Sequence, residues 1–122
     1  MDDNLIHQER LSPNWDERAL PISMVVLHYT GMLSADAALE RLIDPEAKVS
    51  AHYMIDEDGT VTLLVPESKR AWHAGRSYWR GITDVNSASI GIELVNPGHE
   101  WGYKPFPQAQ IGSLIRLLAD IV

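Results

Sequence analysis

The stretch Ile22-Ser23-Met24-Val25-Val26-Leu27-His28-Tyr29-Thr30-Gly31 decides the fold expected for this chain. Its first six residues are mostly apolar and partly β-branched, which predicts a buried strand over 22–27. The run ends abruptly at His28. A histidine at the end of a buried strand is held stiffly at the rim of a sheet, where it can serve as a metal ligand or an acid–base group. The alternative is a histidine that is simply satisfied by hydrogen bonds at a strand end.

The residues that follow predict a helix and then a hairpin. Ser34 is a suitable N-cap for a helix over 35–43, which Asp44-Pro45 would end. Two β-rich runs, 51–55 and 61–65, flank the segment Asp56-Glu57-Asp58-Gly59-Thr60. Two such runs around an Asp-Gly turn predict a β-hairpin.

The rest of the chain completes an α/β pattern. Residues 1–20 are polar and are expected to wrap the surface, and 66–87 form a long irregular segment of the kind that is usually functional. A strand is expected over 89–95. Pro107 suits a first helical position, and the helix after it has apolar residues at helical spacing: Ile111, Leu114, Ile115, Leu118 and Ile121. The order β-α-β-β-loop-β-α predicts a single domain over 1–122, with a central mixed sheet flanked by helices.

Composition narrows the classes of function. The 122 residues contain no cysteine, which excludes disulfides and thiolate metal sites. The net charge of −7 makes nucleic acid a poor partner. The local basic cluster of Lys69, Arg70, Arg76 and Arg80 indicates a small anionic ligand rather than nucleic acid. No secretory signal and no apolar run long enough for a membrane span are visible, so a cytoplasmic location is expected, with a periplasmic one as the alternative if the N-terminus was trimmed.

Glu93 is the most unusual residue of the last expected strand. With a period of two, the strand places one set of side chains on each face: Ile90, Ile92 and Leu94 against Gly91, Glu93 and Val95. A carboxylate among apolar neighbours is costly unless it is paired or its face opens into a cleft. Gly91 beside it leaves space for a ligand to approach. A solvated strand face is the alternative explanation.

Two further histidines could belong to the same cleft. His52 lies in the first strand of the hairpin, where it could line the cleft or be a histidine at the edge of the core. His73 lies in a cluster of aromatic and basic residues, whose aromatic rings could stack on sugar or peptide. Neither an H-E-x-x-H motif nor a G-x-S-x-G motif is present. The residues alone therefore predict a mixed α/β domain with a His/Glu cleft suited to hydrolysis.

Four segments together resemble the type 2 N-acetylmuramoyl-L-alanine amidase family, which extends to T7-type lysozymes and peptidoglycan recognition proteins. These segments are Val25-Val26-Leu27-His28-Tyr29-Thr30, Val49-Ser50-Ala51-His52-Tyr53-Met54-Ile55, Lys69-Arg70-Ala71-Trp72-His73-Ala74-Gly75, and Asn86 through Ile90-Gly91-Ile92-Glu93-Leu94. The resemblance implies a central mixed sheet with a substrate groove across one side. It also implies hydrolysis of the amide bond between N-acetylmuramic acid, or its 1,6-anhydro form, and L-alanine in peptidoglycan or muropeptides.

The same resemblance implies roles for particular residues. His28 matches the first of three ligands of a Zn²⁺ cofactor, and Glu93 matches the catalytic glutamate that activates or orients the zinc-bound water. The expected substrate contacts are Trp72, His73, Ala74, Asn86, Lys48 and His52. Lys48 would face the acidic end of the peptide.

The chain departs from the family pattern in one respect. The other two zinc ligands of the family lie beyond the last helix, in a segment that resembles H-x-D-x-A-P-x-R-K-x-D-P-G, and the sequence ends at Val122 before it. We expect a longer parent protein that supplies these ligands. A non-catalytic muropeptide-binding module that has lost the metal is the alternative, and a second chain that completes the site is a third possibility. Retention of Glu93 favours the enzyme.

Overall fold

The computed structural model describes residues 5–98 and 104–122. Its main sheet has five strands in the order β1-β5-β4-β7-β3. The bounds are β1 Gln8–Glu9, β3 Met24–Tyr29, β4 Tyr53–Ile55, β5 Val61–Leu63 and β7 Ser89–Leu94. β4 and β5 are antiparallel, whereas β7 is parallel to both β3 and β4 and β1 is parallel to β5. The mixed central sheet expected from the sequence is confirmed.

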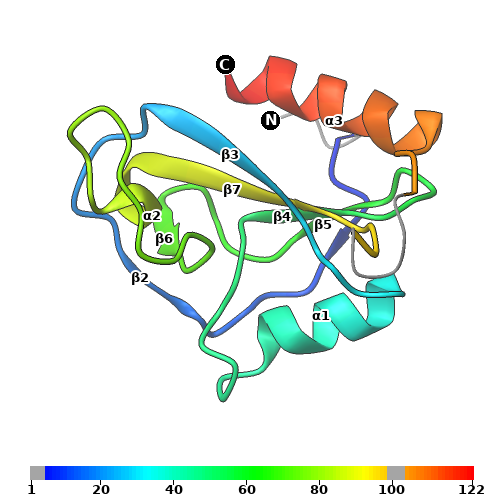
Figure 1. The fold of residues 1–122 in the computed structure, drawn as a ribbon, viewed down its shortest axis with the longest axis horizontal. Coiled ribbons are helices and arrows are strands. Elements are labelled where there is room, and N and C mark those ends of the chain that lie inside the picture. Colours follow the sequence, from blue (N-terminus) through cyan, green and yellow to red (C-terminus); the bar gives the residue numbers. More distant parts are fainter. Residues whose placement is uncertain (1–4, 99–103) are drawn as a thin grey trace.

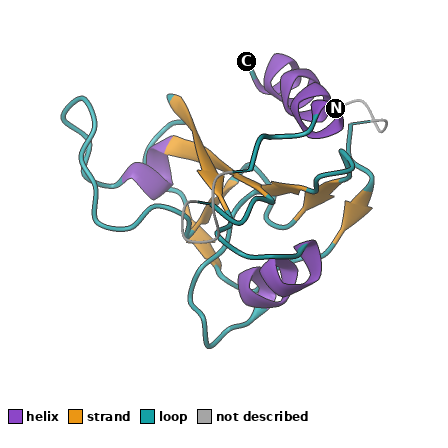
Figure 2. Cartoon of the chain, turned by 45° about the vertical axis from the view of Figure 1, so that its right-hand side comes forward, coloured by secondary structure: helices purple, strands orange, loops and turns teal. Residues whose placement is uncertain are grey.

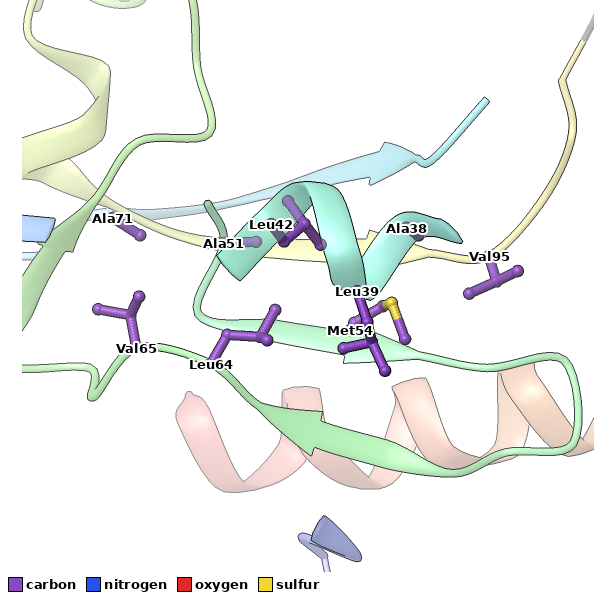
Figure 3. Packing of buried hydrophobic residues seen from close by; sticks show 9 residues of the cluster. All are labelled: Ala38, Leu39, Leu42, Ala51, Met54, Leu64, Val65, Ala71 and Val95. Carbon is purple, nitrogen blue, oxygen red and sulfur yellow. The ribbon is translucent and has the colours of Figure 1, made fainter. Parts of the chain in front are cut away.

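Helix α1, Ala35–Ile43, covers one face of this sheet (Figure 1). It begins as expected, because the side chain of the N-cap Ser34 accepts a hydrogen bond from the amide of Ala37 at 3.2 Å. Its buried face packs on a cluster of apolar side chains (Figure 3): Ala38, Leu39, Leu42, Ala51, Met54, Leu64, Val65, Ala71 and Val95. Burial of such side chains, at about 1.5–3 kcal/mol each, holds α1 on the sheet.

Helix α3, Gln108–Ile121, lies on the opposite face (Figures 1 and 2). The cluster between α3 and the sheet contains Tyr53, Ile55, Val61, Ile90, Ile92, Leu94, Leu114 and Leu117. The expected division of the last strand is confirmed, because Ile90, Ile92 and Leu94 share this face. Most of the expected helix face is confirmed, because Ile111, Leu114, Leu118 and Ile121 belong to this cluster or pack against it. Ile115 is instead 61% exposed and Leu117 is buried, and Pro107 is the N-cap rather than the first helical residue.

Strand β3 is an edge strand, which corrects the expectation of a buried strand over 22–27. It pairs only with β7 within the described chain, and Leu27 and Tyr29 are 47% and 49% exposed. It also begins two residues later and includes His28, which lies within the strand rather than after it. An apolar run of this length does not distinguish a central strand from an edge strand.

The hairpin is confirmed. Short elements also form in the polar segment 1–20, which was expected to wrap the surface, and in the segment 66–87, which was expected to be irregular. β2, Trp15–Glu17, pairs antiparallel with β6, Lys69–Ala71, in a second sheet of two strands. A short helix, α2 (Val85–Ala88), leads into β7. Residues between β6 and α2 form a loop that projects from the body of the domain (Figure 2). Elements of two to four residues carry too little periodicity to be predicted.

Arg18 joins these peripheral segments to the sheet. Its guanidinium donates hydrogen bonds to five backbone carbonyls, those of Glu67, Lys69, Asn86, Ser87 and Ser89, at 2.6–3.4 Å. The fixed fork of the guanidinium suits several acceptors at once. Arg18 therefore fixes the start of β6 relative to α2 and β7. Within the described ranges, no helix has the length and apolar character needed to cross a membrane.

Candidate active site

His28 and Glu93 lie side by side on the α1 face of the sheet. They are register partners in the parallel pair β3–β7, so their side chains leave the sheet at the same level and on the same face. Glu93 lines a cavity of about 370 Å³. The cavity is bounded by the end of β3, by α1 and by the segments before β4 and after β6, including Thr30, Arg41, Ser50, Trp72 and His73.

The carboxyl group of Glu93 is poised to exchange a proton near neutral pH. Burial raises the pKa of Glu93 to about 7, and the positive charge of Arg41 opposes part of this rise. One carboxyl oxygen, Oε2, is buried and has no hydrogen-bond partner among the described residues. A buried acceptor without a partner is expensive in a folded protein and is typical of a functional site. Glu93 thus has the environment of a general base.

His28 is held by a second histidine. Its Nε2 lies 3.0 Å from Nδ1 of His73, and Nε2 of His73 lies 2.9 Å from Oγ of Ser89. The two rings are edge-on, with centroids 5.2 Å apart. The sequence suggested that Gly91 leaves room for a ligand, but the ring of His73 occupies that room. A Cβ atom at Gly91 would lie 2.3 Å from Cγ of His73.

Burial keeps these histidines neutral. It lowers the pKa of His28, and it lowers that of His73 to about 3. Metals bind the neutral form of imidazole. At neutral pH His28 therefore presents an imidazole that is competent to bind a metal.

The structure does not support His52 as a substrate contact. Its side chain has no exposed surface, Nδ1 accepts a hydrogen bond from the amide of Gly91 at 3.0 Å, and Nε2 lies 2.8 Å from the carbonyl of Lys69. Burial lowers the pKa of His52 to about 4. Because both ring nitrogens bond to backbone, His52 is a structural residue that links β7 to β6. This agrees with the alternative given above, a histidine at the edge of the core.

Asn86 also organises the site rather than facing the cavity. Its Oδ1 accepts hydrogen bonds from the amides of His73 and Ala74, at 3.1 and 2.8 Å. Trp72 and His73 line the cavity beside Glu93, as expected for a groove wall, whereas Ala74 faces a neighbouring hollow along β3. The amide of Trp72 is in turn fixed by Oγ of Ser50 at 2.9 Å. The wall is thus built from backbone held by two polar side chains.

Three basic residues expected near the site differ in their surroundings. Lys48 is exposed, with a left-handed φ of 53°, immediately before the cavity residues Val49 and Ser50. Lys69 instead pairs with Glu17, and Arg70 pairs with Asp16 and Asp84. These two members of the predicted basic cluster serve the β2–β6 sheet, because their charges are already paired.

The donors present fit a zinc centre only in part. His28 offers one nitrogen, and the unpartnered oxygen of Glu93 lies beside it. Residues 5–98 and 104–122 contain no group of three or more metal-binding side chains. Catalytic zinc takes three protein ligands. The described part of the chain therefore offers one histidine nitrogen with a carboxyl group in the neighbouring strand, fewer donors than a complete zinc site needs.

Three contributors to the site were not predicted from the sequence. They are Arg41, which faces Glu93 from α1, Ser50, which fixes Trp72, and Ser89, which contacts His73. Arg41 lies in a helix that the cap at Ser34 predicted, so its place near the cavity could have been inferred once the helix was packed on the Glu93 face. The two serines carry no comparable signal, because their role depends on residues distant in sequence.

A mixed sheet covered on both faces, with a neutral histidine beside a glutamate of raised pKa at a cleft, defines an α/β domain whose site has the groups that hydrolysis requires. Comparison with known proteins identifies the family. The chain belongs to the N-acetylmuramoyl-L-alanine amidase family (Amidase_2), whose profile matches residues 18–122. The resemblance found in the sequence is confirmed.

Two curated relatives illustrate the match. The chain is 41% identical over 113 residues to N-acetylmuramoyl-L-alanine amidase AmiD of Escherichia coli, covering 83% of this chain and 40% of AmiD. It is 34% identical over 125 residues to 1,6-anhydro-N-acetylmuramyl-L-alanine amidase AmpD of Haemophilus influenzae, covering 87% of this chain and 66% of AmpD. The chain therefore spans less than two thirds of either relative.

Solved structures share the fold. AmiD from E. coli, in complex with the substrate anhydro-N-acetylmuramic acid-L-Ala-D-γ-Glu-L-Lys, superimposes with a TM-score of 0.73 at 41% identity, over 87% of this chain and 46% of that one. AmpDH3 from Pseudomonas aeruginosa, in complex with anhydromuramic pentapeptide, gives a TM-score of 0.74 at 30% identity, over 92% and 48%. The expected amidase fold is confirmed.

Proposed function

We propose that the protein containing this chain hydrolyses the amide bond between N-acetylmuramic acid, or its 1,6-anhydro form, and L-alanine in muropeptides, with zinc as its cofactor. The observation that carries this proposal is the register pairing of His28 with Glu93 beside a cavity. The substrates bound to AmiD and AmpDH3 support the same substrate class.

In this proposal His28 is one zinc ligand, and the remaining ligands come from outside the described residues. A zinc ion held in part by His28 would lower the pKa of a bound water and polarise the carbonyl of the scissile amide. Glu93 holds the proton removed from water and delivers it to the departing amine of L-alanine. A pKa of about 7 suits both directions of transfer near neutral pH.

The walls of the cavity position the substrate. Trp72 offers an aromatic surface to the sugar or the first residues of the peptide, and its backbone is fixed by Ser50. Lys48, exposed beside the cavity, is placed to meet a carboxylate of the stem peptide. A muropeptide has an apolar sugar face and an acidic peptide, so these two groups match its chemistry.

A muropeptide-binding module without catalysis is the second candidate. It is favoured by the absence of three metal-binding side chains in one group among the described residues. The buried carboxyl of Glu93 disfavours it, because a binding groove gains nothing from an acceptor left without a partner.

The test uses the natural full-length protein and the tripeptide compound anhydro-N-acetylmuramic acid-L-Ala-D-γ-Glu-L-Lys. Release of free peptide is followed by liquid chromatography with mass spectrometry, and bound zinc by elemental analysis. We expect peptide release and one zinc per chain, no release with zinc retained in Glu93→Gln, and loss of both in His28→Ala. Binding of the muropeptide without zinc or turnover in the natural protein would establish the binding module instead.

A further inference from the structure

The hydrogen bonds around His73 have a fixed direction. Oγ of Ser89 lies 2.6 Å from the carbonyl oxygen of Val85, which can only accept, so the single hydroxyl hydrogen of Ser89 points there. Ser89 is fully buried, so solvent offers no other partner. The contact of 2.9 Å between Ser89 Oγ and Nε2 of His73 then requires His73 to donate.

The donor role of Nε2 in His73 also determines which nitrogen of His28 carries the proton. A neutral imidazole carries one N–H, so a proton on Nε2 leaves Nδ1 of His73 as an acceptor. Nδ1 lies 3.0 Å from Nε2 of His28, which must therefore donate. The proton of His28 is thus on Nε2, and its Nδ1 keeps a free lone pair to which no described residue bonds.

Packing fixes the His73 ring as firmly as the hydrogen bonds do. The ring lies directly on the backbone of β7, because Gly91 leaves no Cβ in its way. The backbone of His73 is held by Asn86 through its amide. The ring, its two nitrogens and its backbone are all constrained, which is the condition for a precise supporting residue.

We propose that His73 is a positioning residue for His28: through Ser89 it sets the tautomer and the plane of the His28 ring, which leaves Nδ1 as the nitrogen that would bind a metal. This inference rests on the proposed function for the identity of the metal. Metal-bound histidines usually donate their other N–H to a carboxylate, a carbonyl or water. Here the acceptor is a second histidine, which becomes an acceptor only because a serine hydroxyl fixes its tautomer.

The inference changes the role expected for His73. The resemblance placed it among the substrate contacts, yet both of its nitrogens are already engaged. Its ring can border the cavity by contact alone. Substitutions at His73 should accordingly act first on His28 and on the metal.

The experiment reads the tautomers directly in the 122-residue chain without metal. Long-range ¹H–¹⁵N correlation spectra at pH 8 distinguish a proton on Nδ1 from one on Nε2 for each histidine. We expect His28 and His73 both to carry it on Nε2. His52, which accepts from Gly91 through Nδ1, provides an internal reference for the intact fold.

Three variants test the chain of contacts. Ser89→Ala removes the group that fixes His73, and His73→Phe keeps a ring over Gly91 but removes the acceptor. Both should leave His28 as a mixture of tautomers while His52 stays unchanged. His73→Gln, which carries an acceptor and a donor, should restore a proton on Nε2 of His28.

Zinc affinity of the natural protein, measured by chelator competition, gives a second readout that does not require activity. Ser89→Ala and His73→Phe should weaken zinc binding by about 10–100-fold. A proton on Nδ1 of His28 in the unaltered chain, or a His28 tautomer unchanged in both variants, would overturn the proposal. If the tautomers behave as expected but muropeptide is not cleaved, only the proposed function fails.

Discussion

His28 and Glu93 are paired across the β3–β7 ladder, so two residues far apart in sequence meet on one face of the sheet. Neighbouring parallel strands hold register partners at the same level of the sheet. The loops between the strands therefore have little effect on how His28 lies relative to Glu93. Met54 is the partner of Glu93 on the other side, in β4. Glu93 thus has a histidine as its register partner in one neighbouring strand and an apolar residue, Met54, in the other.

The first prediction concerns the stability that the folded protein loses when the buried carboxyl of Glu93 is ionised. The folded protein raises the pKa of Glu93 from 4.5 to about 7, so between these values the folded state binds more protons than the unfolded state. The stabilisation by the neutral carboxyl is complete below pH 4.5 and is lost as the pH rises through 7. This pKa change corresponds to about 3 kcal/mol. Urea unfolding should show Glu93→Gln more stable than the unaltered chain at pH 8 by up to that amount, with little difference at pH 4.5.

The matched control for this prediction is Glu40→Gln, which removes an exposed carboxylate from α1. It should change stability by less than about 0.5 kcal/mol at both pH values. If Glu93→Gln is no more stable than the unaltered chain at pH 8, the carboxyl is not desolvated as the structure indicates.

The second prediction concerns Arg41, whose charge acts against the desolvation of Glu93. Arg41→Gln should raise the pKa of Glu93 further, by a fraction of a unit because Arg41 is exposed and its field is screened. The carboxyl carbon of Glu93, followed by ¹³C NMR during a pH titration, reports this pKa. Added salt should raise the pKa of Glu93 in the unaltered chain and have less effect in the variant. Arg10→Gln, on the opposite edge of the sheet, should leave the titration unchanged.

The third prediction concerns acid. Burial lowers the pKa of His52 from 6.5 to about 4, and that of His73 to about 3. The unfolded chain takes up these protons first, so the stability due to the neutral rings is present above pH 6.5 and is lost as the pH falls through the folded values. For His52 this amounts to about 3 kcal/mol.

Glu93 partly hides this loss in the unaltered chain, because its protonation stabilises the fold over the same interval. The free energy of unfolding should therefore fall more steeply between pH 7 and 4.5 in Glu93→Gln than in the unaltered chain. Adding His52→Gln to that variant should make the slope shallower, whatever its effect at pH 7. An identical slope in both variants would show that His52 does not resist protonation in the folded state.

The sequence predicted the elements with strong local signals and missed those that depend on distant partners. The capped helix α1, the hairpin of β4 and β5 and the alternating faces of β7 follow from spacing and turn residues alone. β2 and β6 have three residues each and form only because they pair with one another. The edge position of β3 was invisible for the same reason, since an apolar run does not record how many neighbours it will have.

The candidate site shows the same division. Roles for His28 and Glu93 in one site were implied by resemblance to the family, and the strand pattern marked Glu93 as unusual without it. Their pairing across β3 and β7 was not predicted. Whether His52 or His73 would face the cavity was not decidable from sequence, because each lies beside the same strand and their hydrogen-bond partners come from elsewhere. Gly91 illustrates the difficulty: the absent side chain makes room for another residue of the chain, not for a ligand.

The last prediction concerns Arg18, whose guanidinium donates to carbonyls in both segments that carry the site. Arg18→Met leaves those carbonyls without a donor, and hydrogen bonds to charged groups contribute about 1.5–3 kcal/mol each. We expect a loss of about 3–5 kcal/mol in urea unfolding, and Arg18→Lys should recover less than half of it because an ammonium lacks the planar fork. Arg10→Met, at an exposed position whose side chain bonds to no described residue, should change stability by less than about 0.5 kcal/mol. If Arg18→Met were as mild as Arg10→Met, the carbonyls would find water instead, and the site segments would not depend on this residue.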